Sequence, residues 1–112
     1  MVFHVNHSQE LSAGFVQQIT KLKDLTLLNQ AVLLKGVNDH VDTLKKLSLD
    51  LFKVGILPYY LHMLDPVSGA ERYFIEDEVA LKLHQRLKSE LSGYLVPRLV
   101  RDEGKSSKSW LL

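Results

Sequence analysis

Short apolar stretches alternate along this chain with longer stretches in which apolar residues recur at helical spacing. Residues 25–34 are almost continuously apolar, which is typical of a parallel strand covered on both faces. Residues 2–6, 56–62 and 94–100 have similar short patterns, and we predict strands there as well. The alternation predicts an α/β fold made of parallel β-α-β-α-β-α-β units with right-handed crossovers.

Apolar residues three or four positions apart predict the helices between these strands. The expected buried positions are Leu11, Phe15, Ile19 and Leu22 in the first helix, Val41, Leu44, Leu47 and Leu51 in the second, and Val79, Leu83, Leu87 and Leu91 in the third, over residues 76–92. Polar residues and glycines predict the helix ends: Ser8 or Ser12 and then Asn38 or Asp39 as N-caps, with Gly55 and Gly93 as closing residues. The acidic group at residues 76–78 suits a helix N-terminus, where negative charge is favoured.

The length of the chain limits what these units can build. Each unit takes roughly 30 residues, and a closed barrel of eight such units needs about 250. A chain of 112 residues therefore forms either a small open sheet or a piece of a larger barrel. We expect residues 1–100 to form the strand–helix units and residues 101–112 to form a polar tail.

Composition excludes several functions. The net charge of +1 offers no excess of basic residues, so we expect no binding to nucleic acid. No apolar run reaches the roughly 18 residues that a membrane span needs. The chain has no cysteine, which excludes disulfides and thiolate ligands and fits the cytoplasmic protein that we expect. His4 and His7 lie three apart in an extended segment, which places them on opposite faces and argues against a shared metal.

Ligands of parallel α/β folds bind at the carboxyl ends of the strands. This rule selects the polar residues there: Asn6, His7, Asn29, Gln30, Asn38, Asp39, His62, Asp65, Arg101 and Asp102. Several have simpler interpretations. The Asn29-Gln30 pair either braces the sheet or faces a polar ligand, because a buried amide must find hydrogen bonds. Asn38-Asp39 fits a helix cap, and Asp65 fits a turn before Pro66.

Several of these stretches together resemble the lysine 2,3-aminomutase family of radical S-adenosylmethionine enzymes. The matching segments are His4-Val5-Asn6-His7, the long stretch from Leu27 to Asp39, Pro58-Tyr59-Tyr60-Leu61-His62 with Asp65, and Ser92-Gly93-Tyr94-Leu95-Val96-Pro97. Their order and spacing agree with the family over nearly the whole chain. The region Ser107-Lys108-Ser109 looks most like the branch that makes (R)-β-lysine for the modification of elongation factor P.

The resemblance implies the C-terminal part of a partial TIM-type barrel and an isomerase that moves the α-amino group of lysine to its β carbon. It implies S-adenosylmethionine, a [4Fe–4S] cluster and pyridoxal phosphate as cofactors of the full-length enzyme. By motif position Lys108 matches the lysine that binds pyridoxal phosphate, and Asp65 and Asp102 match acids that bind the lysine substrate. We expect Gln30, His62 and Asn6 to contribute to cofactor binding.

The chain departs from the family in three ways. It lacks the three-cysteine cluster motif, its glycine-rich stretch before Lys108 is reduced to Gly104, and the spacing from Asp102 to Lys108 is one residue short. We therefore expect a fragment that is inactive alone, lacks the N-terminal part of the enzyme, and self-associates. The alternative is a self-contained α/β binding or assembly module without catalysis, whose strand-end polar residues only brace the fold.

Overall fold

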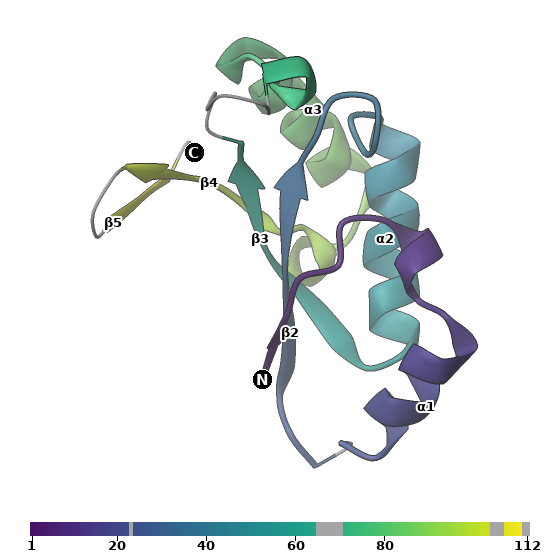
Figure 1. Ribbon diagram of the computed structural model, residues 1–112. Helices are drawn as coiled ribbons and strands as arrows, with labels where there is room; N and C mark the ends of the chain where they lie inside the picture. Colours follow the sequence, from purple (N-terminus) through teal and green to yellow (C-terminus); the bar gives the residue numbers. More distant parts are fainter. Residues whose placement is uncertain (23, 65–70, 104–106, 111–112) are drawn as a thin grey trace.

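The computed structural model describes residues 1–22, 24–64, 71–103 and 107–110, the last four and residues 102–103 as backbone. Strands and helices alternate as the sequence predicts (Figure 1). The described elements are β1 (Val2–Phe3), η1 (Ser8–Glu10), α1 (Ala13–Thr20), β2 (Leu27–Leu33), α2 (Val41–Lys53), β3 (Ile56–Met63), η2 (Glu71–Tyr73), α3 (Asp77–Glu90), η3 (Gly93–Leu95), β4 (Arg98–Glu103) and β5 (Ser107–Trp110).

The sheet of the described residues has the strand order β1-β2-β3-β4-β5. Strands β1 to β4 pair in parallel, which confirms the predicted α/β class. Strand β5 pairs antiparallel with β4, and no strand was predicted there. Only residues 104–106 separate the two strands, a connection that permits a hairpin but is far too short for a parallel crossover. The segment predicted as a polar tail thus contains the end of β4 and all of β5.

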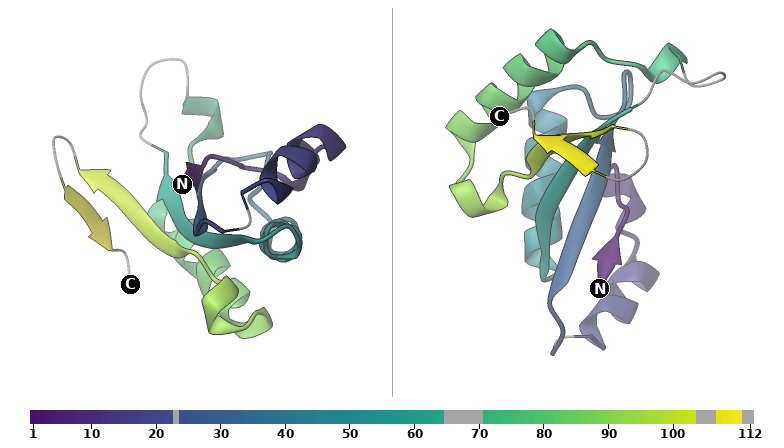
Figure 2. Two further views of the ribbon diagram at one scale, coloured as in Figure 1. Left: turned by 90° about the horizontal axis from the view of Figure 1, so that it is seen from below. Right: turned by 90° about the vertical axis from the view of Figure 1, so that its left-hand side faces the viewer.

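Helices α1, α2 and α3 lie on one side of the sheet, and the opposite side faces the viewer in the right-hand view of Figure 2. Helix α2 buries all four apolar residues of its predicted stripe, Val41, Leu44, Leu47 and Leu51. They pack in one core with the helix-facing residues of the sheet, among them Leu27, Ala31 and Leu33 of β2 and Ile56, Leu61 and Met63 of β3. The alternation of buried and partly exposed residues along β2 shows that one face of the sheet is covered more than the other.

Helix ends follow the predicted chemistry in part. The Ser12 hydroxyl accepts a hydrogen bond from Phe15 N at 3.2 Å, which confirms Ser12 as the cap of α1. Gly55 has φ +88°, the left-handed conformation that was predicted after α2. Gly93 does not close α3: that helix ends at Glu90, Leu91 is extended, and Gly93 begins η3.

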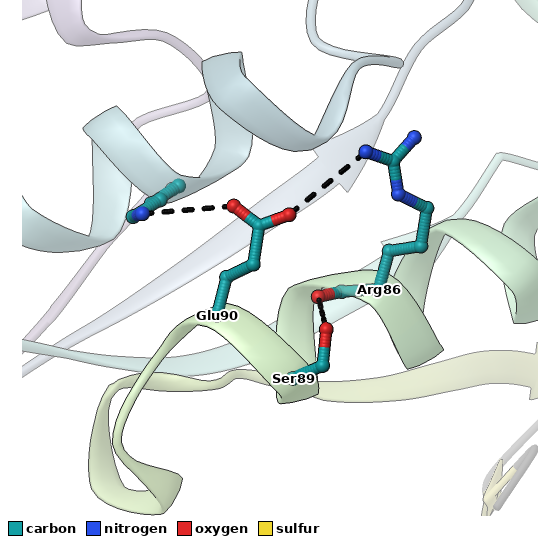
Figure 3. Close-up of polar contacts among 4 residues, drawn as sticks. Arg86, Ser89 and Glu90 are labelled. Atoms are coloured by element: carbon teal, nitrogen blue, oxygen red, sulfur yellow. Dashed lines mark hydrogen bonds and ion pairs between the residues drawn. The ribbon is translucent and has the colours of Figure 1, made fainter.

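Helices α2 and α3 are joined at their surface through Glu90 (Figure 3). One carboxylate oxygen of Glu90 lies 3.6 Å from Lys45 Nζ of α2, and the other lies 3.9 Å from Arg86 of the preceding turn. The Ser89 hydroxyl donates to the Arg86 carbonyl at 2.7 Å. No helix within the described residues is long and apolar enough to cross a bilayer.

Candidate functional site

The helices leave one face of the sheet uncovered (Figure 2), and the alternation of burial along β2 and β3 places polar and aromatic residues on that face. Paired residues of parallel strands point to the same face, and the register places Gln30 of β2 beside Tyr60 of β3. His62 lies two residues further along β3 on the same face, near its carboxyl end. Leu57 and Tyr59 are 37% and 41% exposed there. Two of the predicted cofactor-binding residues, Gln30 and His62, therefore meet on this face.

Gln30 and His62 are in direct contact. His62 Nε2 lies 3.3 Å from Gln30 Oε1. Because an amide oxygen can only accept, Nε2 carries the proton in this hydrogen bond. The Tyr60 ring lies edge-on to the His62 ring, with 5.6 Å between the ring centroids. The His62 imidazole is thus fixed between an amide and a phenol on this face of the sheet.

A β-bulge brings a further aromatic residue to this group. The register passes from Asn29 opposite Pro58 to Gln30 opposite Tyr60, so Tyr59 has no pairing partner in β2. Pro58 has no N–H to donate to the ladder, and a bulge is a usual place for proline inside a sheet. The extra residue lets Tyr59 and Tyr60 lie side by side, with ring centroids 4.3 Å apart and planes 47° apart.

Tyr59 also affects the acidity of Tyr60. A hydrogen bond with Tyr59 raises the pKa of Tyr60, desolvation raises it further, and the nearby charge of Arg98 acts in the opposite direction. Arg98 is the register partner of Tyr60 at the start of β4. The Tyr60 hydroxyl is therefore a neutral hydrogen-bonding group at physiological pH.

Asn38 does not cap α2, contrary to the prediction. The N-cap is His40, without a side-chain cap bond. The Asn38 side chain is fully buried and serves the strands: Oδ1 accepts from Leu34 N at 2.8 Å, and Nδ2 donates to the carbonyls of Asn6 and Val32, each at 2.9 Å. Its three backbone partners satisfy an amide that has no water around it.

Asn6, a predicted cofactor-binding residue, belongs to the same network. Its Oδ1 accepts from Val32 N at 2.9 Å. This bond places Asn6 beside the carboxyl half of β2, as predicted, but occupies its oxygen with the backbone. His7 Nδ1 accepts from Gln9 N at 3.1 Å and caps η1.

Asp39 lies on the helix side of the same end of the sheet. It lines a hollow of about 390 Å³ with Lys35, Glu71, Phe74, Ile75, Glu76 and Val79. The side chain of Asp39 is 23% exposed, and the exposed ring of His40 approaches it to 3.8 Å. Neither Gln30 nor His62 lines this hollow, so it is separate from their group.

The remaining predicted residues lie in or near the C-terminal hairpin. Asp102 of β4 and Lys108 of β5 are register partners, so their backbones lie directly opposite each other. Arg101 forms an ion pair with Asp77 in the first turn of α3. Asp65, the predicted substrate-binding acid after β3, lies outside the described residues.

Sequence reasoning missed two features of this molecule. The first is the Tyr59–Tyr60 pair, which proline inside a strand could have signalled as a bulge. The second is His84 of α3, 1% exposed, whose Nε2 lies 2.7 Å from the Pro97 carbonyl. Burial lowers the pKa of His84, and the charge of Lys88 adds to the shift, although the bond to Pro97 opposes it. No local sequence pattern separates such a buried histidine from an exposed one.

The fold and this site define a parallel strand–helix unit with a polar, aromatic group on its uncovered face. No family model matches the chain. Curated relatives do: L-lysine 2,3-aminomutase of Haemophilus influenzae is 52% identical over 104 residues, covering 91% of this chain and 31% of the relative. The proteins of the same name from Escherichia coli and Buchnera aphidicola are 46% and 44% identical over 93% and 99% of this chain.

The chain belongs to the lysine 2,3-aminomutase family, as its motifs indicated. It spans about a third of the length of these curated relatives, with 31%, 31% and 34% of each covered.

Proposed function

We propose that this chain is the C-terminal part of an L-lysine 2,3-aminomutase, an isomerase that moves the α-amino group of lysine to the β carbon and produces β-lysine. The observation that supports it most is the 52% identity to a protein of that name over 91% of this chain. The parallel sheet, which leaves one face without helices, fits one side of a barrel whose interior would be that face.

The residues of this chain fit only some of the cofactors that this activity implies. An iron–sulfur cluster needs thiolate ligands, and the chain has no cysteine, so the cluster would be held elsewhere in a full-length protein. S-adenosylmethionine would meet Gln30 and His62, which offer amide and imidazole groups on β2 and β3, and Asn6, which would contribute its side-chain NH2 because its oxygen already accepts from Val32 N. Pyridoxal phosphate would be held by the amine of Lys108.

In a full-length enzyme S-adenosylmethionine and the cluster would supply the radical that activates lysine, and pyridoxal phosphate would carry the migrating amino group. The residues of this chain would bind and orient. We propose that Asp65 and Asp102 bind the ammonium groups of lysine, because carboxylates are the natural partners of ammonium. The backbone register that sets Asp102 opposite Lys108 supports a shared role, since it brings the two positions to one place on the hairpin.

The proposal extends to the product. The resemblance of Ser107-Lys108-Ser109 to the elongation factor P branch favours (R)-β-lysine as the product and that factor as its destination. Chiral separation of the product that a full-length enzyme forms from L-lysine tests this part. Formation of the S enantiomer would remove the assignment to that branch and leave the aminomutase activity in place.

The central test uses a full-length protein that contains this sequence. Treatment with borohydride in the presence of pyridoxal phosphate should fix the cofactor covalently to Lys108, as peptide mass spectrometry would show. Lys108→Ala should abolish the adduct, and Lys105→Ala, which removes a lysine of the same segment, should keep it. An adduct that persists in Lys108→Ala would refute the role of Lys108, and a protein without any adduct would favour the non-catalytic binding module.

A further inference from the structure

The most unusual local feature of the sheet is the pair of consecutive tyrosines on one face. Consecutive strand residues normally point to opposite faces. Here the bulge after Pro58 changes the phase of β3, and the burial of the strand changes with it: Leu57 and Tyr59 are exposed before the bulge, and Tyr60 and His62 are half-buried after it. Bulges are frequent next to binding sites, where they redirect a side chain.

The two rings form a fixed surface. Their centroids are 4.3 Å apart, and their planes are 47° apart. Tyr60 is held on its other side by the edge of the His62 ring at 5.6 Å. A surface of held aromatic rings binds a planar partner at low entropic cost, because few rotamers remain to be lost.

A polar edge borders this surface. His62 and Gln30 hold each other at 3.3 Å, and they lie further toward the carboxyl ends of the strands than Tyr59. Imidazole and amide groups together donate and accept hydrogen bonds. An aromatic surface with such an edge suits a ring that can both stack and form hydrogen bonds.

We infer that Tyr59 and Tyr60 form a stacking surface for a planar heteroaromatic ring, with His62 and Gln30 contacting its polar edge. The core does not require Tyr59 to be there, because Tyr59 is 41% exposed while the helix-facing residues Ile56 and Leu61 of the same strand are 0% and 1% exposed. The inference deepens the proposed function and rests on it for one point, that the uncovered face receives a ligand. Both S-adenosylmethionine and pyridoxal phosphate contain a heteroaromatic ring.

Equilibrium dialysis of a full-length protein that contains this sequence against adenosine tests the inference, because the isolated chain is expected to associate through the same face. Adenosine is uncharged, so its binding does not arise from attraction to lysine or arginine, and ribose is the control that lacks the ring. Saturable binding of adenosine is expected below about 10 mM, without binding of ribose. A second arm replaces adenosine with pyridoxine: tighter binding of pyridoxine would assign the surface to a pyridine ring, and tighter binding of adenosine to a purine.

Variants locate the binding. Tyr59→Ala should weaken adenosine binding about tenfold or more, since stacking on one aromatic side chain contributes about that factor. Tyr59→Leu keeps apolar bulk at the bulge and should weaken binding as well, even if Tyr59→Ala fails to fold. The matched control is Tyr94→Ala, because Tyr94 is 61% exposed and also belongs to an aromatic pair, with Phe52 at 5.6 Å on the helix side.

Absence of saturable binding, or equal loss in Tyr59→Leu and Tyr94→Ala, would overturn the inference. Its failure is distinct from failure of the proposed function, because adenosine binding does not involve Lys108. A Lys108 adduct without adenosine binding would remove only the stacking surface. Adenosine binding without an adduct would remove only the aminomutase assignment.

Discussion

The side-chain amide of Asn29 forms a pair of hydrogen bonds with the backbone of Val5, accepting from Val5 N at 2.8 Å and donating to Val5 O at 2.9 Å. Asn29 is 2% exposed and Val5 is 5% exposed. The amide thus replaces a strand partner where β1 has already ended at Phe3. Of the two interpretations of the Asn29-Gln30 pair, bracing is correct for Asn29, and Gln30 lies on the opposite face.

Replacing Asn29 with Ala should therefore destabilise the chain. The substitution leaves the N–H and the carbonyl of Val5 buried without partners, at a cost of about 2–4 kcal/mol in the free energy of unfolding. The control is Gln30→Ala on the same strand, whose half-buried side chain should cost less than about 1 kcal/mol. Urea unfolding followed by circular dichroism measures both, and a similar loss in the two variants would contradict the bracing role.

Two glycines should respond in opposite directions to the same substitution. Gly55 has φ +88°, and an added Cβ at either Gly55 or Gly14 meets no atom within 4 Å. Only the backbone conformation therefore distinguishes them. Gly55→Ala should cost about 1 kcal/mol or more, because L residues avoid the left-handed region. Gly14→Ala in helix α1 should stabilise the chain by about 0.5–1 kcal/mol. Thermal unfolding decides the signs, and a stabilised Gly55→Ala would refute the argument.

The success of sequence reasoning differs between elements for physical reasons. Helix α2 was predicted with its full buried stripe because its apolar residues and its one packing face coincide. In α3 the regular apolar row predicted Val79 as buried, yet Val79 is 53% exposed, whereas Ala80 and His84 are each 1% exposed. Periodicity gives the spacing of a buried row, but the neighbouring elements decide which row is buried. Ala80 and His84 hardly contribute to an apolar periodicity, because one is small and the other is polar.

The candidate site was predictable to a similar extent. The rule that ligands bind at the carboxyl ends of parallel strands selected Gln30 and His62, which do meet. It also selected Asn38, whose amide instead holds backbone groups that no strand partner reaches. Sequence shows that a polar residue is near a strand end, but it does not show which backbone groups there lack partners.

His84 should make the stability of the chain depend on pH. Because burial lowers the pKa of His84 below that of an unfolded histidine, the unfolded state binds the proton first as the pH falls. The contribution of neutral His84 to the free energy of unfolding is therefore fully present above the usual histidine pKa, and it is lost as the pH drops below that value. The urea concentration at the midpoint of unfolding should fall from about pH 7.5 to about pH 5.5. His84→Gln, which keeps a hydrogen-bond donor near Pro97, should make this decline less steep.

The matched control for that measurement is His40→Gln, since the side chain of His40 is 81% exposed. If His84→Gln keeps the full slope, or if both variants flatten it equally, the buried imidazole is not the group that titrates. The absolute stability of His84→Gln does not enter this comparison, because only the slope is used.

The uncovered face of the sheet should make the isolated chain self-associate. Leu57, Tyr59 and Val2 are all at least 37% exposed, and β1 ends the strand order of the described residues with an edge that no strand of the sheet covers. Exposed apolar area beside an open strand edge promotes pairing between copies. Light scattering should therefore give an average mass above that of the 12.8 kDa chain, and this mass should rise with protein concentration.

Two equally exposed leucines allow the role of this face to be compared with that of another part of the surface. Leu57 on β3 and Leu49 on the outer side of α2 are both 37% exposed, so the same change can be made at equal exposure on opposite sides. Leu57→Asp should shift the chain toward the monomer, because it introduces a charge into the face that pairs, whereas Leu49→Asp should not. An equal shift in both variants would show that the uncovered face does not drive association. A monodisperse monomer of the unsubstituted chain would show that this face is stable in water without a partner.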